Sequence, residues 1–151
     1  MNAILDLTYR NRKAMLKIIE PLSVAQLNYI PEAFNNNIIW NLAHVISVQQ
    51  GLVYGLSNLN FKIEKDFVKA YTKGTKPMGD VFEKDVSIIK EQLLYTIEQT
   101  ELDISADRFQ TYNEYPVMLG NTLTNVTDAL QFNNYHEGLH LGVIMSLKKF
   151  V

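Results

Sequence analysis

Apolar residues recur every three or four positions along four long stretches of this chain, which is the spacing of one buried helix face. A helix with one apolar face must pack that face against other elements. The pattern therefore predicts an all-α fold whose core lies between the helices. We expect these helices over residues 3–20, 38–55, 82–101 and 124–151.

Residues that favour helix ends mark several of these boundaries. Ser23 and Gln26 have the spacing of a capping box, which predicts a short helical turn after the first helix. The run Asn35–Asn37 offers N-caps for the second long helix. Thr122 or Thr124 is expected to cap the fourth.

Two long connections, residues 57–80 and 103–121, separate the later helices. The first holds about 24 residues, and each can extend roughly 3.3 Å, enough to run back along a helix of about 30 Å. The second and third helices can therefore be parallel, which predicts a four-helix bundle with long crossover connections. Without an internal repeat or a linker-like stretch, we expect one domain over residues 1–151.

Composition excludes several classes of protein. The content of 47% hydrophobic and 20% charged residues is that of a globular chain. A formal charge of −2 with no basic stripe argues against nucleic-acid binding, and no apolar run is long enough to predict a membrane span. The absence of cysteine excludes disulfides and thiolate ligands. We expect a cytoplasmic protein, because a signal-peptide core is broken by charged residues at Asp6, Arg10, Arg12 and Lys13.

The three histidines are the strongest functional signal. His136 and His140 are four residues apart, so on one helix their side chains differ by about 40° and about 6 Å along the axis. They lie on the apolar stripe of the fourth helix, and His44 lies beside Trp40 on the stripe of the second. Buried imidazoles without partners cost roughly 1–3 kcal/mol each, so a shared metal ion explains them better than three isolated hydrogen bonds. Three protein ligands would leave open positions, as in catalytic zinc sites.

The run from His136 to His140 also has the H-E-x-x-H pattern of zinc proteases, with Glu137 as the base. Those enzymes take a third ligand from a downstream residue. The segment LGVIMSLKKFV after His140 contains neither a histidine nor an acidic residue. Peptide cleavage is therefore disfavoured.

Two short motifs contain the histidines: Asn37-Ile38-Ile39-Trp40, which leads into His44, and the closing run HEGLHLGVI from His136 to Ile144. Together with the PLSVAQL turn and the two long connections, they resemble the DinB/YfiT-like superfamily of metalloenzymes over essentially the whole chain. The resemblance implies an up-down-down-up bundle, a three-histidine site for zinc, nickel or a similar ion, and a homodimer. Some relatives use low-molecular-weight thiols such as bacillithiol or mycothiol. Many relatives have glutamine where this chain has Val143, which leaves the activity open.

Other residues have a functional and a structural interpretation. Glu137 points about 100° away from His136 around the helix, so a surface position is favoured over a role as a base. Trp40 can wall a cavity or belong to the core, and Asn133 can orient a ligand or a water molecule. Gly138 and Gly142 indicate close helix packing or room for a ligand.

Two classes of function follow. The first is a metal-dependent enzyme acting on a small molecule, either a thiol-dependent S-transferase or a hydrolase. The second is a non-catalytic bundle that binds metal or dimerises.

Overall fold

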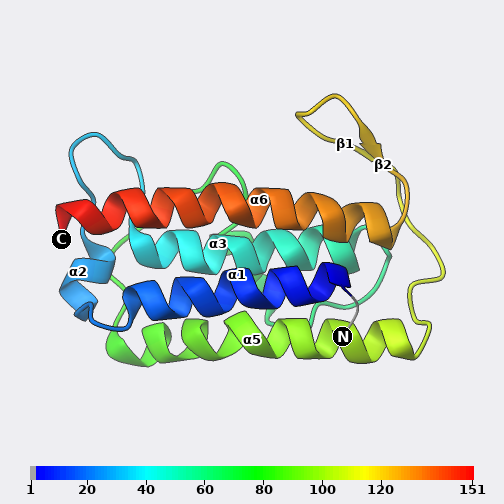
Figure 1. The fold of residues 1–151 in the computed structure, drawn as a ribbon, viewed down its shortest axis with the longest axis horizontal. Helices are drawn as coiled ribbons and strands as arrows, with labels where there is room; N and C mark the ends of the chain where they lie inside the picture. Colours follow the sequence, from blue (N-terminus) through cyan, green and yellow to red (C-terminus); the bar gives the residue numbers. More distant parts are fainter. Residues whose placement is uncertain (1–2) are drawn as a thin grey trace.

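The computed structural model describes residues 3–151, which are mostly helical, so the all-α expectation is confirmed. In this part of the chain, Figure 1 shows four long helices lying side by side, two running in one direction and two in the other. The helices α1 (Ala3–Ile19) and α6 (Val126–Leu147) form the first pair, and α3 (Ile38–Gln50) and α5 (Glu83–Ser105) the second. Both α1 and α3 pack against both α5 and α6.

Short elements occupy the connections between the long helices: α2 (Val24–Asn28), the π-helical turn η1 (Gly51–Gly55), α4 (Lys65–Ala70), β1 (Tyr115–Pro116), β2 (Thr122–Leu123) and the 3₁₀ turn η2 (Lys148–Phe150). The turn η1 continues α3 directly, so the second helical stretch ends near residue 55 as predicted. The antiparallel pair β1–β2 was not predicted, because two-residue strands are too short to show an alternating pattern.

Side-chain caps explain where three helices begin. The Ser23–Gln26 capping box forms at α2. The Asn37 side chain accepts a hydrogen bond from the backbone N–H of Trp40 at 2.9 Å, as expected for the cap of α3. The threonine cap expected for α6 is wrong, because Asn125 accepts from the backbone N–H of Asp128 at 2.9 Å. Asparagine is a stronger N-cap than threonine, and Asn125 stands one residue nearer the helix than Thr124.

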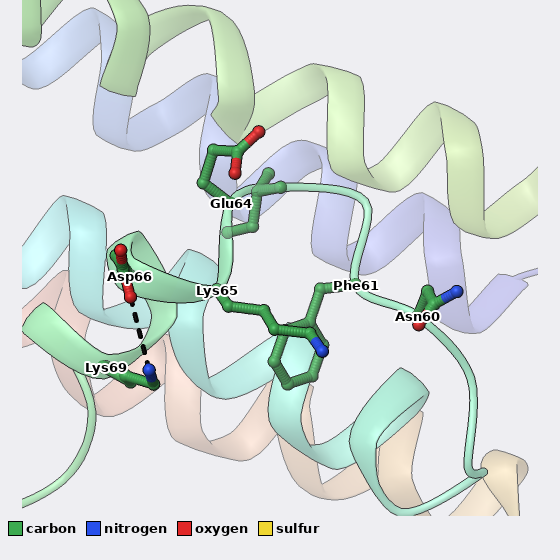
Figure 2. Close-up of a pocket in the computed structure, with 7 residues that line it drawn as sticks. Asn60, Phe61, Glu64, Lys65, Asp66 and Lys69 are labelled. Atoms are coloured by element: carbon green, nitrogen blue, oxygen red, sulfur yellow. Dashed lines mark hydrogen bonds and ion pairs between the residues drawn. The ribbon is translucent and has the colours of Figure 1, made fainter.

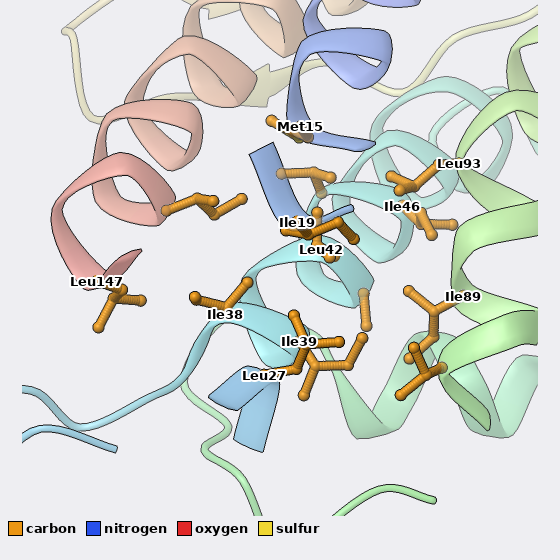
Figure 3. Packing of buried hydrophobic residues seen from close by; sticks show 14 residues of the cluster. Met15, Ile19, Leu27, Ile38, Ile39, Leu42, Ile46, Ile89, Leu93 and Leu147 are labelled. Atoms are coloured by element: carbon orange, nitrogen blue, oxygen red, sulfur yellow. The ribbon is translucent and has the colours of Figure 1, made fainter. Parts of the chain in front are cut away.

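The main core surrounds α3, most of whose residues are buried. Figure 3 shows Leu42 and Ile46 of α3 among residues from other helices, including Ile19 of α1 and Leu93 of α5. Burying each such side chain contributes roughly 1.5–3 kcal/mol. This packing fixes the rotation of α3, and therefore the direction of His44.

Polar groups also lie between the helices. They include the fully buried side chains of Arg12, Gln49, Gln50, Thr96 and Thr100. These groups bond one another across helices, as in the 2.9 Å hydrogen bond that Gln49 Nε2 donates to Thr100 Oγ1. Among residues 3–151, no helix combines the length and the apolar composition that crossing a bilayer requires.

Candidate metal site

His44 of α3 and the pair His136 and His140 of α6 meet where the two helices face each other. Their ring centroids are separated by 5.1, 4.7 and 4.5 Å, and one nitrogen from each ring lies within 4.8 Å of the other two. Zn–N bonds of about 2.0–2.1 Å place tetrahedral nitrogen ligands about 3.4 Å apart, so small side-chain rotations would bring all three onto one ion. Over the described residues, this is the single group of three or more His, Asp or Glu side chains with such spacing.

The surroundings of His44 determine which ring nitrogen faces the other two histidines. Its Nδ1 lies 2.6 Å from the backbone carbonyl oxygen of Tyr71. A carbonyl only accepts, so Nδ1 carries the proton and Nε2 keeps its lone pair. The indole of Trp40 stacks on the ring, with centroids 4.6 Å apart and planes at 13°. Trp40 therefore covers one face of the His44 ring, and it also belongs to the buried core.

Asn41 orients His140 in the same way. Its Oδ1 lies 2.7 Å from Nδ1 of His140. Its Nδ2 donates to the backbone oxygen of Asn37 at 2.7 Å and to Oδ1 of Asn36 at 3.0 Å, so the amide orientation is determined. Nδ1 of His140 must donate, which again leaves Nε2 free to bind a metal. The sequence pattern did not indicate this role of Asn41, although its position three residues before His44 was a signal.

His136 differs from the other two histidines. Its Nδ1 is buried and has no hydrogen-bond partner within residues 3–151. A buried nitrogen without a partner costs roughly 1–3 kcal/mol, and a metal ion bound at this ring would provide a partner for one of its two nitrogens. The donor set therefore fits a divalent transition metal.

Burial keeps all three rings neutral. It lowers the pKa of His136 to about 3, with smaller contributions from the neighbouring His140 and His44 rings. Burial and the His44 ring lower the pKa of His140 to about 4, and burial lowers the pKa of His44 although its bond to Tyr71 opposes this. Neutral imidazole is the form that binds metals.

The protein-family comparison agrees with this geometry. The model of the DinB superfamily matches residues 7–144. The chain belongs to the DinB superfamily. The matched segment contains all three histidines and the whole of α3 and α5. No curated protein matched the chain.

In this DinB superfamily protein, Glu137 is not the surface residue that the helix geometry favoured. It is fully buried, and its Oε1 accepts hydrogen bonds from Arg12 Nη2 at 2.8 Å and Nε at 3.1 Å. Asn133 donates to the same oxygen at 2.8 Å, so it holds Glu137. The partners Arg12 and Glu137 are 125 residues apart, which is why no local pattern indicated this pair.

The two glycines expected to allow close helix packing or to leave room for a ligand face outward. Both Gly138 and Gly142 are exposed, and an added Cβ would meet no atom within 4 Å. Among residues 3–151, no element therefore packs closely against either glycine.

Two cavities among residues 3–151 lie outside the histidine cluster. One of about 200 Å³ is lined in part by Trp40 and Tyr71, the two residues that contact His44. A second, of about 530 Å³, lies at the start of α4, where Figure 2 shows Lys65 and the Asp66–Lys69 ion pair of 3.3 Å. His136 and His140 are partly exposed, whereas His44 is 5% exposed.

Proposed function

We propose that His44, His136 and His140 hold one divalent transition-metal ion, zinc or nickel, and that this DinB superfamily protein is a metal-dependent enzyme. The observation that carries the proposal is the meeting of three neutral imidazoles whose nitrogens lie within 4.8 Å. The hydrogen bonds that Nδ1 of His44 donates to the Tyr71 carbonyl and Nδ1 of His140 donates to Asn41 Oδ1 support it, because they aim Nε2 of both rings at the site.

We further propose that the four long helices are the up-down-down-up bundle of the family and that the protein is a cytoplasmic homodimer with a small-molecule substrate. The opposed directions of the two helix pairs support the bundle. The outward face of α6 offers apolar side chains for a dimer, among them Tyr135, Leu139 and Met145.

The proposed reaction is attack by a low-molecular-weight thiol on an electrophile. A sulfur–carbon bond forms, the leaving group departs with the bonding electron pair, and the thiol proton passes to solvent. The chain contains no cysteine, so the sulfur must come from a cosubstrate. A divalent ion lowers the pKa of a bound thiol and polarises an electrophile.

The chain's own residues would position and shield this chemistry. Three neutral ligands leave the positive charge of the ion uncompensated. Tyr71 and Asn41 hold two of the ligand rings, and Trp40 covers one face of His44 against water. Glu137 is an unsuitable base, because its carboxylate is fully buried against Arg12.

Metal content tests the site. Wild-type protein and the variants His44→Ala, His136→Ala and His140→Ala are purified without an affinity tag, and the metal content of each is measured by elemental analysis. We expect about one ion per wild-type chain and loss of metal in each variant. Wild-type retention in any variant would remove that histidine from the site.

Thiol consumption tests the reaction. Metal-loaded protein is incubated with bacillithiol, mycothiol, glutathione or coenzyme A and a reactive halide, with the three histidine variants as controls. Acceleration with one thiol, lost in the variants, is expected. If no thiol reacts faster than in buffer, a metal-dependent hydrolase or a non-catalytic metal-binding bundle becomes the better assignment.

A further inference from the structure

A second cluster of charged side chains lies at the end of α3 that is remote from the histidines. Tyr54 of η1 is ten residues beyond His44, or roughly 15 Å along the helix axis. Together with Lys62, Asp103 and Arg108 it lines a cavity of about 230 Å³. Leu59 and Phe61 contribute apolar surface to the same cavity.

Tyr54 and Lys62 provide partners for the buried carboxylate of Asp103. Asp103 Oδ2 accepts a hydrogen bond from the Tyr54 hydroxyl at 2.9 Å and lies 2.6 Å from Lys62 Nζ. Burial holds the pKa of Tyr54 above its ordinary value, so the phenol stays a neutral donor. Lys62 forms the short ion pair with Asp103, and this ion pair joins the segment after η1 to α5.

Arg108 is not needed for that ion pair. Its Nε lies 3.7 Å from Asp103 Oδ1, its side chain is 57% exposed, and its guanidinium donates no hydrogen bond to any residue in the range 3–151. The end of α5 places it there, because Asp107 has φ 52° and the Arg108 N–H bonds the Asp103 carbonyl at 3.0 Å. Two cations against one carboxylate leave one net positive charge at the cavity.

We propose that this cavity binds a small organic carboxylate, held by the Arg108 guanidinium, with its apolar body against Leu59 and Phe61. The planar fork of arginine matches a carboxylate in two parallel hydrogen bonds. A monoanion matches the single surplus charge better than a dianionic phosphate. A volume of about 230 Å³ lies below the roughly 300–1,000 Å³ of pockets for drug-sized ligands, so the ligand is small. No histidine takes part, so the site is separate from the proposed metal centre.

Calorimetric titration of the full chain with benzoate, and separately with inorganic phosphate, tests the proposal. We expect saturable benzoate binding that weakens at least ten-fold in Arg108→Gln and by less in Arg108→Lys, which keeps the charge but loses the fork. Arg10→Gln is the matched control, because Arg10 also pairs with a carboxylate, Asp6 at 2.6 Å, on an exposed helix face. This control and His136→Ala should bind benzoate as the wild type does.

Three results would overturn the proposal. They are absence of saturable benzoate binding, tighter binding of phosphate than of benzoate, and unchanged benzoate affinity in Arg108→Gln. Thermal unfolding of each variant is measured in parallel. If Arg108→Gln lowers the melting temperature and binds benzoate normally, Arg108 has a structural role only.

Discussion

At the scale of single residues, the histidine site depends on side chains and carbonyls that would not touch the metal. Asn41 is the clearest, because its amide is held by two acceptors and its oxygen accepts from His140. Loss of such a partner typically costs 10–100-fold in metal affinity. We therefore expect Asn41→Ala to bind zinc about 10–100-fold more weakly in competition with a chelating dye. Asn121→Ala, an exposed loop change, is the control, and equal affinity in the two variants would contradict the role of Asn41.

The lowered pKa values predict how pH affects the metal-free protein. Unfolded histidines bind protons at a pKa near 6.5, whereas His136 and His140 in the folded chain do so at about 3 and about 4. The contribution of these two neutral histidines to the free energy of unfolding is therefore fully present above pH 6.5. It is lost as the pH falls toward the pKa values of the folded chain. At pH 5 the loss is about 2 kcal/mol per imidazole. Urea unfolding at pH 7.5, 6 and 5 measures this loss. His136→Gln should make the free energy of unfolding depend less steeply on pH. A pH-independent free energy of unfolding over this range would refute the prediction.

The buried pair of Arg12 and Glu137 predicts strong coupling. Arg12→Met leaves an uncompensated carboxylate in the interior, which costs about 3–5 kcal/mol. Replacing both residues by methionine removes both charges, so the double variant should be more stable than Arg12→Met. Urea denaturation of the two single variants and the double variant measures the coupling. If the double variant lost as much free energy of unfolding as the two single variants together, the two side chains would act independently.

At the scale of elements, the C-terminus of α5 has the hydrogen bonds of a Schellman motif. The N–H of Asp107 bonds the Ile104 carbonyl at 3.0 Å and that of Arg108 bonds the Asp103 carbonyl at 3.0 Å. Asp107 holds the left-handed position, with φ 52°, that glycine usually occupies.

This motif predicts opposite effects for two substitutions of Asp107. Asp107→Gly should raise the free energy of unfolding by about 0.5–1 kcal/mol, because glycine adopts positive φ without steric cost. Asp107→Ala should lower it, because alanine lacks the local hydrogen bonding that lets aspartate tolerate this conformation. Chemical denaturation compares the two, and the reverse order of stability would show that φ at this position does not matter.

At the scale of the whole molecule, a shared ion would join α3 to α6 across the core. A ligand that binds the folded state alone stabilises it by about 2.7 kcal/mol at 100 times its Kd. For a domain of this size we expect zinc to raise the melting temperature by roughly 5–10 °C. Chelation should reverse the rise, and His44→Ala should show none. Equal shifts in the wild type and His44→Ala would mean that zinc binds elsewhere.

Features that depend on residues close together in the chain could be predicted from the sequence alone. The four helical stretches follow from apolar periodicity, which any helix with one buried face displays. The Ser23–Gln26 box and the Asn37 cap involve partners three residues away, so they could be predicted. The spacing of His136 and His140 likewise places two rings on one helix face. The family resemblance, carried by the same motifs, is confirmed over residues 7–144.

Features that join distant segments of the chain became visible only once the helices were seen packed together. Glu137 was expected at the surface, and only the packing of α1 against α6 brings Arg12 to it across 125 residues. The hydrogen bonds that His140 donates to Asn41 and His44 donates to Tyr71 span 99 and 27 residues. The physical reason is that helical periodicity reports which face is buried, whereas the partner of a buried polar group depends on how helices far apart in the chain pack together.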